Sequence, residues 1–173
     1  IGCRMGCRFC VTGKIGFKRN LSAAEIVGQV ITAREYLRKA GKSPVTNIVF
    51  MGMGEPMDNI DNVATALDIL KDQSGLDLSY RKITLSSVGL VDGLKTLSAK
   101  SAVIAISLNA ADDETRSMLM PINRLYSIGR IMDFARGFKG TKRTRITFEY
   151  ILIKGVNDSL DDAKRLADLL TGV

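Results

Sequence analysis

Residues 45–52 read VTNIVFMG, and this nearly unbroken apolar run decides the fold class that the sequence predicts. Such a run is typical of a β-strand that is covered on both faces. Other stretches predict strands in the same way: KITLSS at 82–87, SAVIAISLNA at 101–110 and RITFEYILI at 145–153. In the last of these, Thr147 and Glu149 alternate with apolar residues and are therefore expected to share one face.

Helices are predicted between these strands. Residues 21–41 carry Ser22 and Glu25 at the spacing of a capping box, and the other predicted helices lie at 62–72, at 90–99, once or twice within 112–138, and at 159–170. The apolar stripe expected on the last helix is Leu160, Ala163, Ala167 and Leu170. Alternating strands and helices predict an α/β fold with a parallel sheet and right-handed crossovers. The expected architecture is a partial (β/α) barrel with outer helices or an open sheet, with a fifth strand just before Ile1.

Length and composition fit a single domain, because the chain has 173 residues of which 46% are hydrophobic. No stretch is long enough to cross a bilayer and the N-terminus does not resemble a signal peptide, so a cytoplasmic protein is expected. The net charge of +7 is compatible with a polyanionic partner such as nucleic acid, or with an ordinary solvated surface. Histidine is absent, which excludes Ser-His-Asp and Cys-His catalysis and any histidine-bearing zinc site.

Glycines and polar residues follow the predicted strands. These segments are GMGEP at 52–56, SSVG at 86–89, SLNA at 107–110 and KGVND at 154–158. Ligands of parallel α/β folds bind at the carboxyl ends of the strands, so the segments are expected to converge over one cavity. Simpler interpretations stay open: GMGEP fits a plain turn, and Ser86, Ser107 and Asn109 fit caps of the following helices. Glu149, inside an apolar strand, needs a partner, which is either a ligand or an arginine.

The three cysteines of the chain, Cys3, Cys7 and Cys10, lie together in CRMGCRFC at residues 3–10. A structural zinc site normally has four ligands, and no fourth cysteine or histidine is present to complete one. A zinc site stays possible if an aspartate or glutamate supplies the fourth ligand. Three thiolates on a 4Fe–4S cluster hold three irons and leave one iron free for a substrate or cofactor. The C-x3-C-x2-C spacing therefore favours a cluster with one open iron.

That spacing, Phe9 before the last cysteine and GEP after the predicted strand at 45–52 make the sequence resemble the radical S-adenosylmethionine (SAM) superfamily. Longer stretches, namely NIVFMGMGEPMDN, MPINRLYSI and ITFEYILIKGVND, are similar to one subfamily, the radical SAM RNA adenine methyltransferases. The resemblance runs from Ile1 to nearly the end of the chain. It implies a radical SAM fold and methylation of adenine carbon 2 in large-subunit rRNA and tRNA.

The same resemblance implies two cofactors, a 4Fe–4S cluster and SAM, and the residues that hold them. The three cysteines would ligate the cluster, and SAM would chelate the free iron. Gly54 and Glu55 would bind the amino end of SAM. The residues expected along its ribose and adenine are Ser86, Ser107, Leu108 and Asn109. Many relatives have histidine where Asn109 stands, and asparagine keeps a hydrogen-bond donor and acceptor but cannot titrate.

The resemblance also predicts partners: large-subunit rRNA, tRNA and an electron donor such as flavodoxin, with no membrane. In this subfamily a cysteine near the C-terminus carries the methyl group, and this chain has no cysteine after Cys10. Residues 1–173 are therefore expected to be the radical SAM core domain of a longer protein. That core lacks the N-terminal extension and the C-terminal part with the methyl-carrying cysteine, and it is expected not to complete methyl transfer alone.

Two other functions stay open at this point. Another radical SAM enzyme, such as an activator of glycyl-radical enzymes, shares the cysteine spacing but does not account for GFKRNL, MPINRLYSI or YILIKGVND. A non-enzymatic zinc-bound RNA-binding module leaves the strand-end motifs unexplained. The basic residues around the cysteines suit a nearby RNA phosphate backbone, and they are Arg4, Arg8, Lys14, Lys18 and Arg19.

Overall fold

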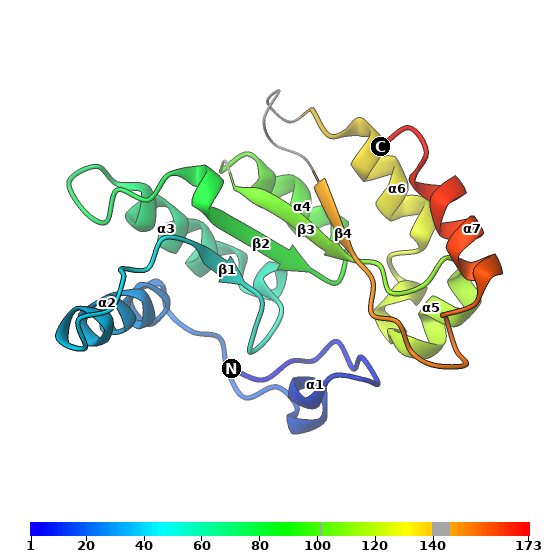
Figure 1. Ribbon diagram of the computed structural model, residues 1–173, viewed down its shortest axis with the longest axis horizontal. Helices are drawn as coiled ribbons and strands as arrows, with labels where there is room; N and C mark the ends of the chain where they lie inside the picture. The colour runs from blue at the N-terminus through cyan, green and yellow to red at the C-terminus, as the bar shows by residue number, and fades with distance from the viewer. Residues whose placement is uncertain (101, 140–145) are drawn as a thin grey trace.

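A computed structural model describes residues 1–100, 102–139 and 146–173, and its centre is an open parallel sheet (Figure 1). The strands run in the order β1-β2-β3-β4, with bounds Ile48–Phe50, Ile83–Ser87, Val103–Ser107 and Ile146–Glu149. All neighbouring pairs are parallel, and helices connect the successive strands. The predicted α/β class is confirmed, and the open sheet is consistent with a partial barrel.

The helices lie where the sequence predicts them, with small differences at their ends. Their bounds are α1 Val11–Ile15, α2 Ala23–Lys39, α3 Ile60–Lys71, α4 Val91–Ser98, α5 Asp113–Leu119, α6 Ile128–Gly137 and α7 Leu160–Leu170. The short helix α1 and the 3-10 turns η1 (Pro56–Asp58), η2 (Tyr80–Lys82) and η3 (Pro121–Arg124) were not predicted. No described helix is long and apolar enough to cross a membrane.

The strands are shorter than the apolar runs that predict them. Strand β1 covers three of the eight residues in 45–52, and β3 ends at Ser107 although the predicted strand continued to residue 110. Residues 101 and 145, the first of two predicted strands, lie outside the described residues. Apolar composition marks where a chain is buried, whereas a strand ends where its ladder of backbone hydrogen bonds ends.

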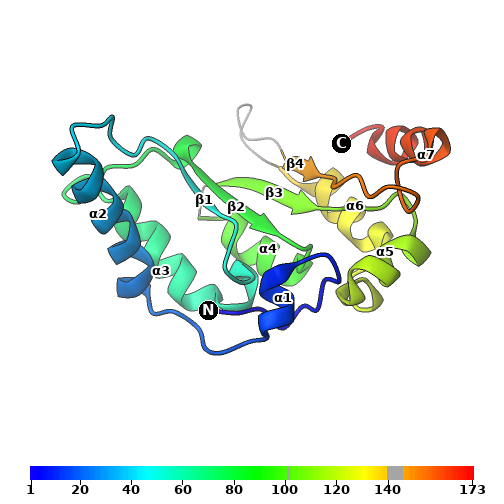
Figure 2. The same cartoon turned by 60° about the horizontal axis from the view of Figure 1, so that its bottom comes forward.

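The apolar core lies on one face of the sheet. Strands β2 and β3 direct alternate side chains to this face, and Leu85 and Ile106 among them are fully buried. Helices α3, α4 and α6 cover the face with Leu67, Leu94 and Ile131, which are also fully buried (Figure 2). Burying each such side chain contributes about 2 kcal/mol, so this layer supplies much of the stability.

The opposite face of the sheet is more polar. The residues that alternate onto it are Val49, Thr84, Ser86, Val103, Ala105, Ser107, Thr147 and Glu149. On the edge strand β1, Val49 is 52% exposed, so the prediction that the strand at 45–52 is covered on both faces is wrong for the described residues. A continuous apolar run therefore does not by itself establish that both faces are covered.

Two helices show how far local sequence predicts packing. At the start of α2 the capping box is confirmed, since Ser22 Oγ accepts from Glu25 N and the Glu25 carboxylate accepts from Ser22 N at 2.9 Å. On α7 the predicted stripe is confirmed for Leu170 and wrong for its other members, because Leu160 is 82% exposed and both alanines are exposed. Helix α7 contacts the molecule through leucines at i, i+3 and i+4 instead, namely Leu166, Leu169 and Leu170. These three form a stronger apolar face than two leucines and two alanines.

Candidate functional site

The cysteine loop, residues 3–10, lies against the end of α5. Cys7 is buried in an apolar cluster with Leu119, and Cys3 and Cys10 pack against the same cluster. Arg8 N donates a hydrogen bond to Leu119 O at 2.9 Å, and Cys10 N donates to Cys7 O at 3.1 Å. All three thiols are free, and Cys10 is the N-cap residue of α1.

The thiols in this loop influence one another. Burial raises the pKa of Cys7 to about 11, Cys3 and Cys10 raise it further, and the charge of Arg116 opposes the rise. Burial also raises the pKa of Cys3. Within the described ranges, no three His, Cys, Asp or Glu side chains form a group that could hold a metal ion. The fit to an iron–sulfur cluster therefore rests on the chemistry of the donors, which are three free thiols in one loop. Three neighbouring thiolates repel one another, so a bound cation is needed to keep all three deprotonated.

Glu55 joins the end of β1 to the end of β2. Its carboxylate accepts hydrogen bonds from Met57 N at 3.1 Å and from Val88 N at 2.9 Å. Burial raises the pKa of Glu55 to about 7, although these two N–H groups oppose the rise. A Cβ on Gly54, where φ is +151°, would lie 3.0 Å from Gly2 O. Glycine at this position therefore lets the GEP segment approach the start of the cysteine loop closely.

Ser86, Ser107 and Glu149 meet on the polar face of the sheet. Glu149 Oε2 accepts hydrogen bonds from Ser86 Oγ at 3.0 Å and from Ser107 Oγ at 2.8 Å. The partner of Glu149 is thus a pair of serine hydroxyls and not the arginine considered from the sequence. The alternative role of the serines as helix caps is wrong, because the N-cap residues of α4 and α5 are Leu90 and Asp112.

Leu108 and Asn109 follow β3 and are both buried. The Leu108 side chain packs with Ile128 and Met132 of α6, its N–H donates to Glu149 O, and its carbonyl accepts from a guanidinium. The structure therefore places Leu108 in the core and leaves neither its side chain nor its backbone polar groups free for a ligand.

Asn109 adopts the left-handed conformation with φ of 59°, which asparagine tolerates better than most residues. Its Oδ1 accepts from Ile151 N at 2.9 Å, and its Nδ2 donates to Met120 Sδ at 3.4 Å. The interpretation of Asn109 as a helix cap is wrong, since Asp112 accepts from the backbone at the start of α5. Asn109 instead joins the end of β3 to the segment after β4.

Asn157, in the predicted strand-end segment KGVND, was not singled out from the sequence. Its Nδ2 donates to Asn109 O at 2.8 Å and to Ile151 O at 2.9 Å, and its Oδ1 accepts from Ile153 N at 2.7 Å. Asparagine in a turn commonly bonds to nearby backbone groups, so the residue type in this predicted loop was a usable signal. The ends of β3 and β4 are thereby fixed to each other.

Arg116 is the second residue that sequence reasoning missed. It is fully buried, and burial lowers the pKa of its guanidinium to about 10. It donates five hydrogen bonds, to Leu108 O, Asn123 Oδ1, Tyr126 O, Val88 O and Ser107 O. With 25 lysines and arginines in the chain, composition gave no reason to select this one.

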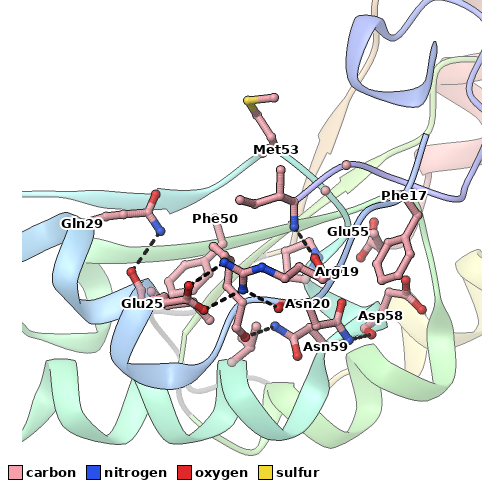
Figure 3. Close-up of a pocket in the computed structure, with 18 residues that line it drawn as sticks. Phe17, Arg19, Asn20, Glu25, Gln29, Phe50, Met53, Glu55, Asp58 and Asn59 are labelled. Carbon is pink, nitrogen blue, oxygen red and sulfur yellow. Dashed lines mark hydrogen bonds and ion pairs between the residues drawn. The ribbon is translucent and has the colours of Figure 1, made fainter. Parts of the chain in front are cut away.

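A cavity of about 500 Å³ opens next to these strand ends, between the N-terminal segment, α2 and the loop from β1 to η1 (Figure 3). Its lining includes Gly54 and Glu55, but it includes no other residue predicted to bind SAM and no cysteine. Arg19 and Glu25 face each other there as an ion pair at 2.7 Å. The predicted site residues converge through hydrogen bonds around the strand ends, and this cavity lies to one side of them.

The structure is that of an α/β protein with an open parallel sheet and a three-cysteine loop packed beside the carboxyl ends of its strands. The sequence profile of the radical SAM superfamily matches residues 1–170, and the chain belongs to this superfamily. Its members use a 4Fe–4S cluster and SAM as cofactors. The resemblance stated from the motifs is thus confirmed over nearly the whole chain.

Proteins named dual-specificity RNA methyltransferase RlmN are close in sequence. The one from Syntrophobacter fumaroxidans is 49% identical over 174 residues, covering 100% of this chain and 50% of that protein. RlmN 2 from Myxococcus xanthus is 48% identical over 178 residues, covering 100% of this chain and 47% of that protein. The crystal structure of a radical SAM methyltransferase from Sphaerobacter thermophilus superposes with a TM-score of 0.94 at 44% identity, covering 99% of this chain and 51% of that one. The chain spans about half the length of the curated relatives it matches.

Proposed function

We propose that this chain is the part of a radical SAM RNA methyltransferase that binds the cluster and SAM, and that the whole protein methylates carbon 2 of adenine in large-subunit rRNA and tRNA. One observation carries the proposal: the ends of β1 to β4 are tied together by Glu55, Glu149 and Asn109, and the cysteine loop packs beside them. The similarity to the RlmN proteins gives the reaction and the substrate class.

In this proposal Cys3, Cys7 and Cys10 hold the cluster. When bound, the cluster would supply the electron for reductive cleavage of SAM. The protein's part is to fix the surroundings of that reaction and to keep water and competing groups away. Glu55 does so by holding the loop that contains Gly54 against the end of β2.

The serines and Asn109 are proposed to act on SAM through the network they belong to. Ser86 and Ser107 are committed to Glu149, and each hydroxyl still has lone pairs to accept a hydrogen bond. Asn109 accepts a hydrogen bond from Ile151 N, so it holds the backbone after β4 in position at the strand ends, where SAM would bind. Leu108 contributes to the site by packing under it.

The RNA is proposed to approach over the cysteine loop. Arg4 and Arg19 are paired with Asp58 and Glu25, at 2.8 Å and 2.7 Å. The neighbouring basic side chains Arg8, Lys14 and Lys18 are exposed. Exposed cations attract phosphates, and the same charges suit an acidic one-electron donor such as flavodoxin. Both partners are consistent with a cytoplasmic protein.

The test is anaerobic reconstitution of the chain with iron and sulfide, followed by addition of SAM and dithionite. We expect 5′-deoxyadenosine to form in the unmodified chain and to be lost in Cys7→Ala. A matched control is Val11→Ala, next to the loop, because this side chain is 71% exposed. Tight zinc binding without a cluster would contradict the proposal.

The chain has no cysteine outside residues 3–10, so it is proposed not to complete methyl transfer by itself. Incubation with unmodified rRNA and labelled SAM measures this directly. We expect 5′-deoxyadenosine without labelled RNA. Methylated adenine in this assay would show that a methyl-carrying cysteine outside residues 3–10 is not required.

A further inference from the structure

Arg116 is a buried cation whose hydrogen bonds all go to uncharged groups. Four of its five acceptors are backbone carbonyls and the fifth is the side-chain amide oxygen of Asn123. Asp113 interacts with it electrostatically, but the Oδ1 of that carboxylate accepts from Asn123 Nδ2 and Ile128 N. A buried charge normally has a charged partner, because desolvation is expensive without one. The positive charge of Arg116 is therefore only partly compensated by the chain itself.

The cysteine loop packs against the residues that surround this charge. Arg116 Nη2 donates to Val88 O at 2.7 Å, and the Val88 side chain packs into the apolar cluster that contains Cys7. One turn along α5, Leu119 and Met120 belong to the same cluster, and Leu119 O accepts from the cysteine loop at Arg8 N. Arg116 and Cys7 also shift each other's pKa, which agrees with this proximity.

We infer that Arg116 is a positioning residue that sets the electrostatic potential at the cysteine loop and so makes the bound cluster easier to reduce. This inference rests on the proposed function, because it requires that Cys3, Cys7 and Cys10 hold a 4Fe–4S cluster. Its basis is a buried guanidinium with uncharged acceptors, held by residues that pack against the loop that carries the thiols.

The physical reason is charge balance. Three thiolates give the site a negative charge, and one-electron reduction by a low-potential donor adds another. A fixed positive charge in a low-dielectric interior stabilises the reduced state more than the oxidised state. Net charge, hydrogen bonds and exposure are known to set cluster potentials. The five hydrogen bonds hold the guanidinium in place, so its effect does not depend on a mobile side chain.

The experiment compares Arg116→Met, Arg116→Gln and Arg116→Lys in the reconstituted chain. The midpoint potential of the cluster is measured by a redox titration with dithionite and viologen mediators, followed by EPR spectroscopy. The matched control is Arg130→Met, which removes an equal charge from an arginine that is 44% exposed and paired with Asp92.

We expect both neutral variants to lower the equilibrium constant for reduction about tenfold, which corresponds to a potential more negative by about 59 mV. Arg116→Lys keeps the charge and should stay near the unmodified value, as should Arg130→Met. If a neutral variant keeps its cluster and its potential, the inference is wrong. A purely structural role predicts that Arg116→Lys, which loses the planar fork, changes as much as Arg116→Gln.

If neither neutral variant retains a cluster, the midpoint potential of Arg116→Lys is the test. This variant keeps the charge but loses most of the hydrogen bonds, so the inference requires its potential to equal that of the unmodified chain. A displaced potential in that variant overturns the inference. An unmodified chain that binds zinc and forms no cluster overturns the proposed function, and the inference with it. A neutral variant that forms a cluster with the potential of the unmodified chain overturns the inference alone.

Discussion

Removing the hydroxyl of Ser107 tests whether the polar face of the sheet is held by Glu149. Ser107 Oγ donates to Glu149 Oε2 at 2.8 Å, and Ser86 Oγ donates to the same oxygen at 3.0 Å. A hydrogen bond to a charged acceptor contributes about 1.5–3 kcal/mol. Glu149 is half-buried, so the lower end of this range applies. We expect Ser107→Ala to reduce the free energy of unfolding by about 1.5 kcal/mol.

The two serines are not independent, because they share one carboxylate oxygen. After Ser107→Ala, Glu149 keeps Ser86 as a donor and loses only part of its compensation. The double variant Ser86→Ala/Ser107→Ala leaves the carboxylate without either donor, so its cost should exceed the sum of the single costs. Non-additivity of this kind is expected for residues that share a partner.

Urea unfolding monitored by circular dichroism measures these differences. With an m-value of about 2 kcal/mol/M, a loss of 1.5 kcal/mol moves the midpoint by roughly 0.7 M. A double-mutant cycle of Ser107→Ala with Glu149→Gln isolates the pairwise energy. Coupling below about 0.3 kcal/mol would mean that the contact does not stabilise the protein, and the reasoning would be refuted. Thr147→Ala, on an exposed residue of the same face, serves as the control.

Four further substitutions have expected effects on stability. Because the pKa of Glu55 is raised from 4.5 to about 7, its contribution to stability is present below pH 4.5 and is lost as the pH rises through 7. That loss is roughly 3 kcal/mol, and urea unfolding at several pH values should give a flatter profile for Glu55→Gln. Gly89→Ala should lower the melting temperature, at a cost of about 2–4 kcal/mol, because φ is +100° and the new Cβ would lie 2.6 Å from an isoleucine methyl. Gly137 lies in a helix with open space around it, so Gly137→Ala should increase the free energy of unfolding by about 0.5–1 kcal/mol and raise the melting temperature. A stabilising Gly89→Ala or a destabilising Gly137→Ala would contradict the steric argument. Asp58→Asn breaks the partly exposed ion pair with Arg4 and should cost under about 1 kcal/mol, with a smaller effect in high salt; a larger cost would show that the pair is more than a surface contact.

Most of the secondary structure and the candidate site could be predicted from the sequence, because those features depend on neighbours along the chain. The capping box of Ser22 and Glu25 spans three residues, and its geometry follows from helix formation alone. The cysteine spacing and the glycine-rich strand ends are also local, and a parallel sheet brings its carboxyl ends to one edge whatever the details of packing. The superfamily, the order of elements and the set of converging segments were therefore accessible without coordinates.

Only the tertiary structure decided which side chain serves which partner. Glu149 bonds to serines on two other strands, 63 and 42 residues away in the sequence. Arg116 is a buried cation because the fold directs four backbone carbonyls, 8 to 28 residues away in the sequence, toward its guanidinium. The face of α7 that is buried is the one that packs with Leu108, Ile128 and Met132. Such choices depend on the register of strands and the approach of helices, which arise from the packing of the whole core. A sequence pattern determines which residues share one face of a helix or strand, whereas only the folded chain determines which residues pack against that face.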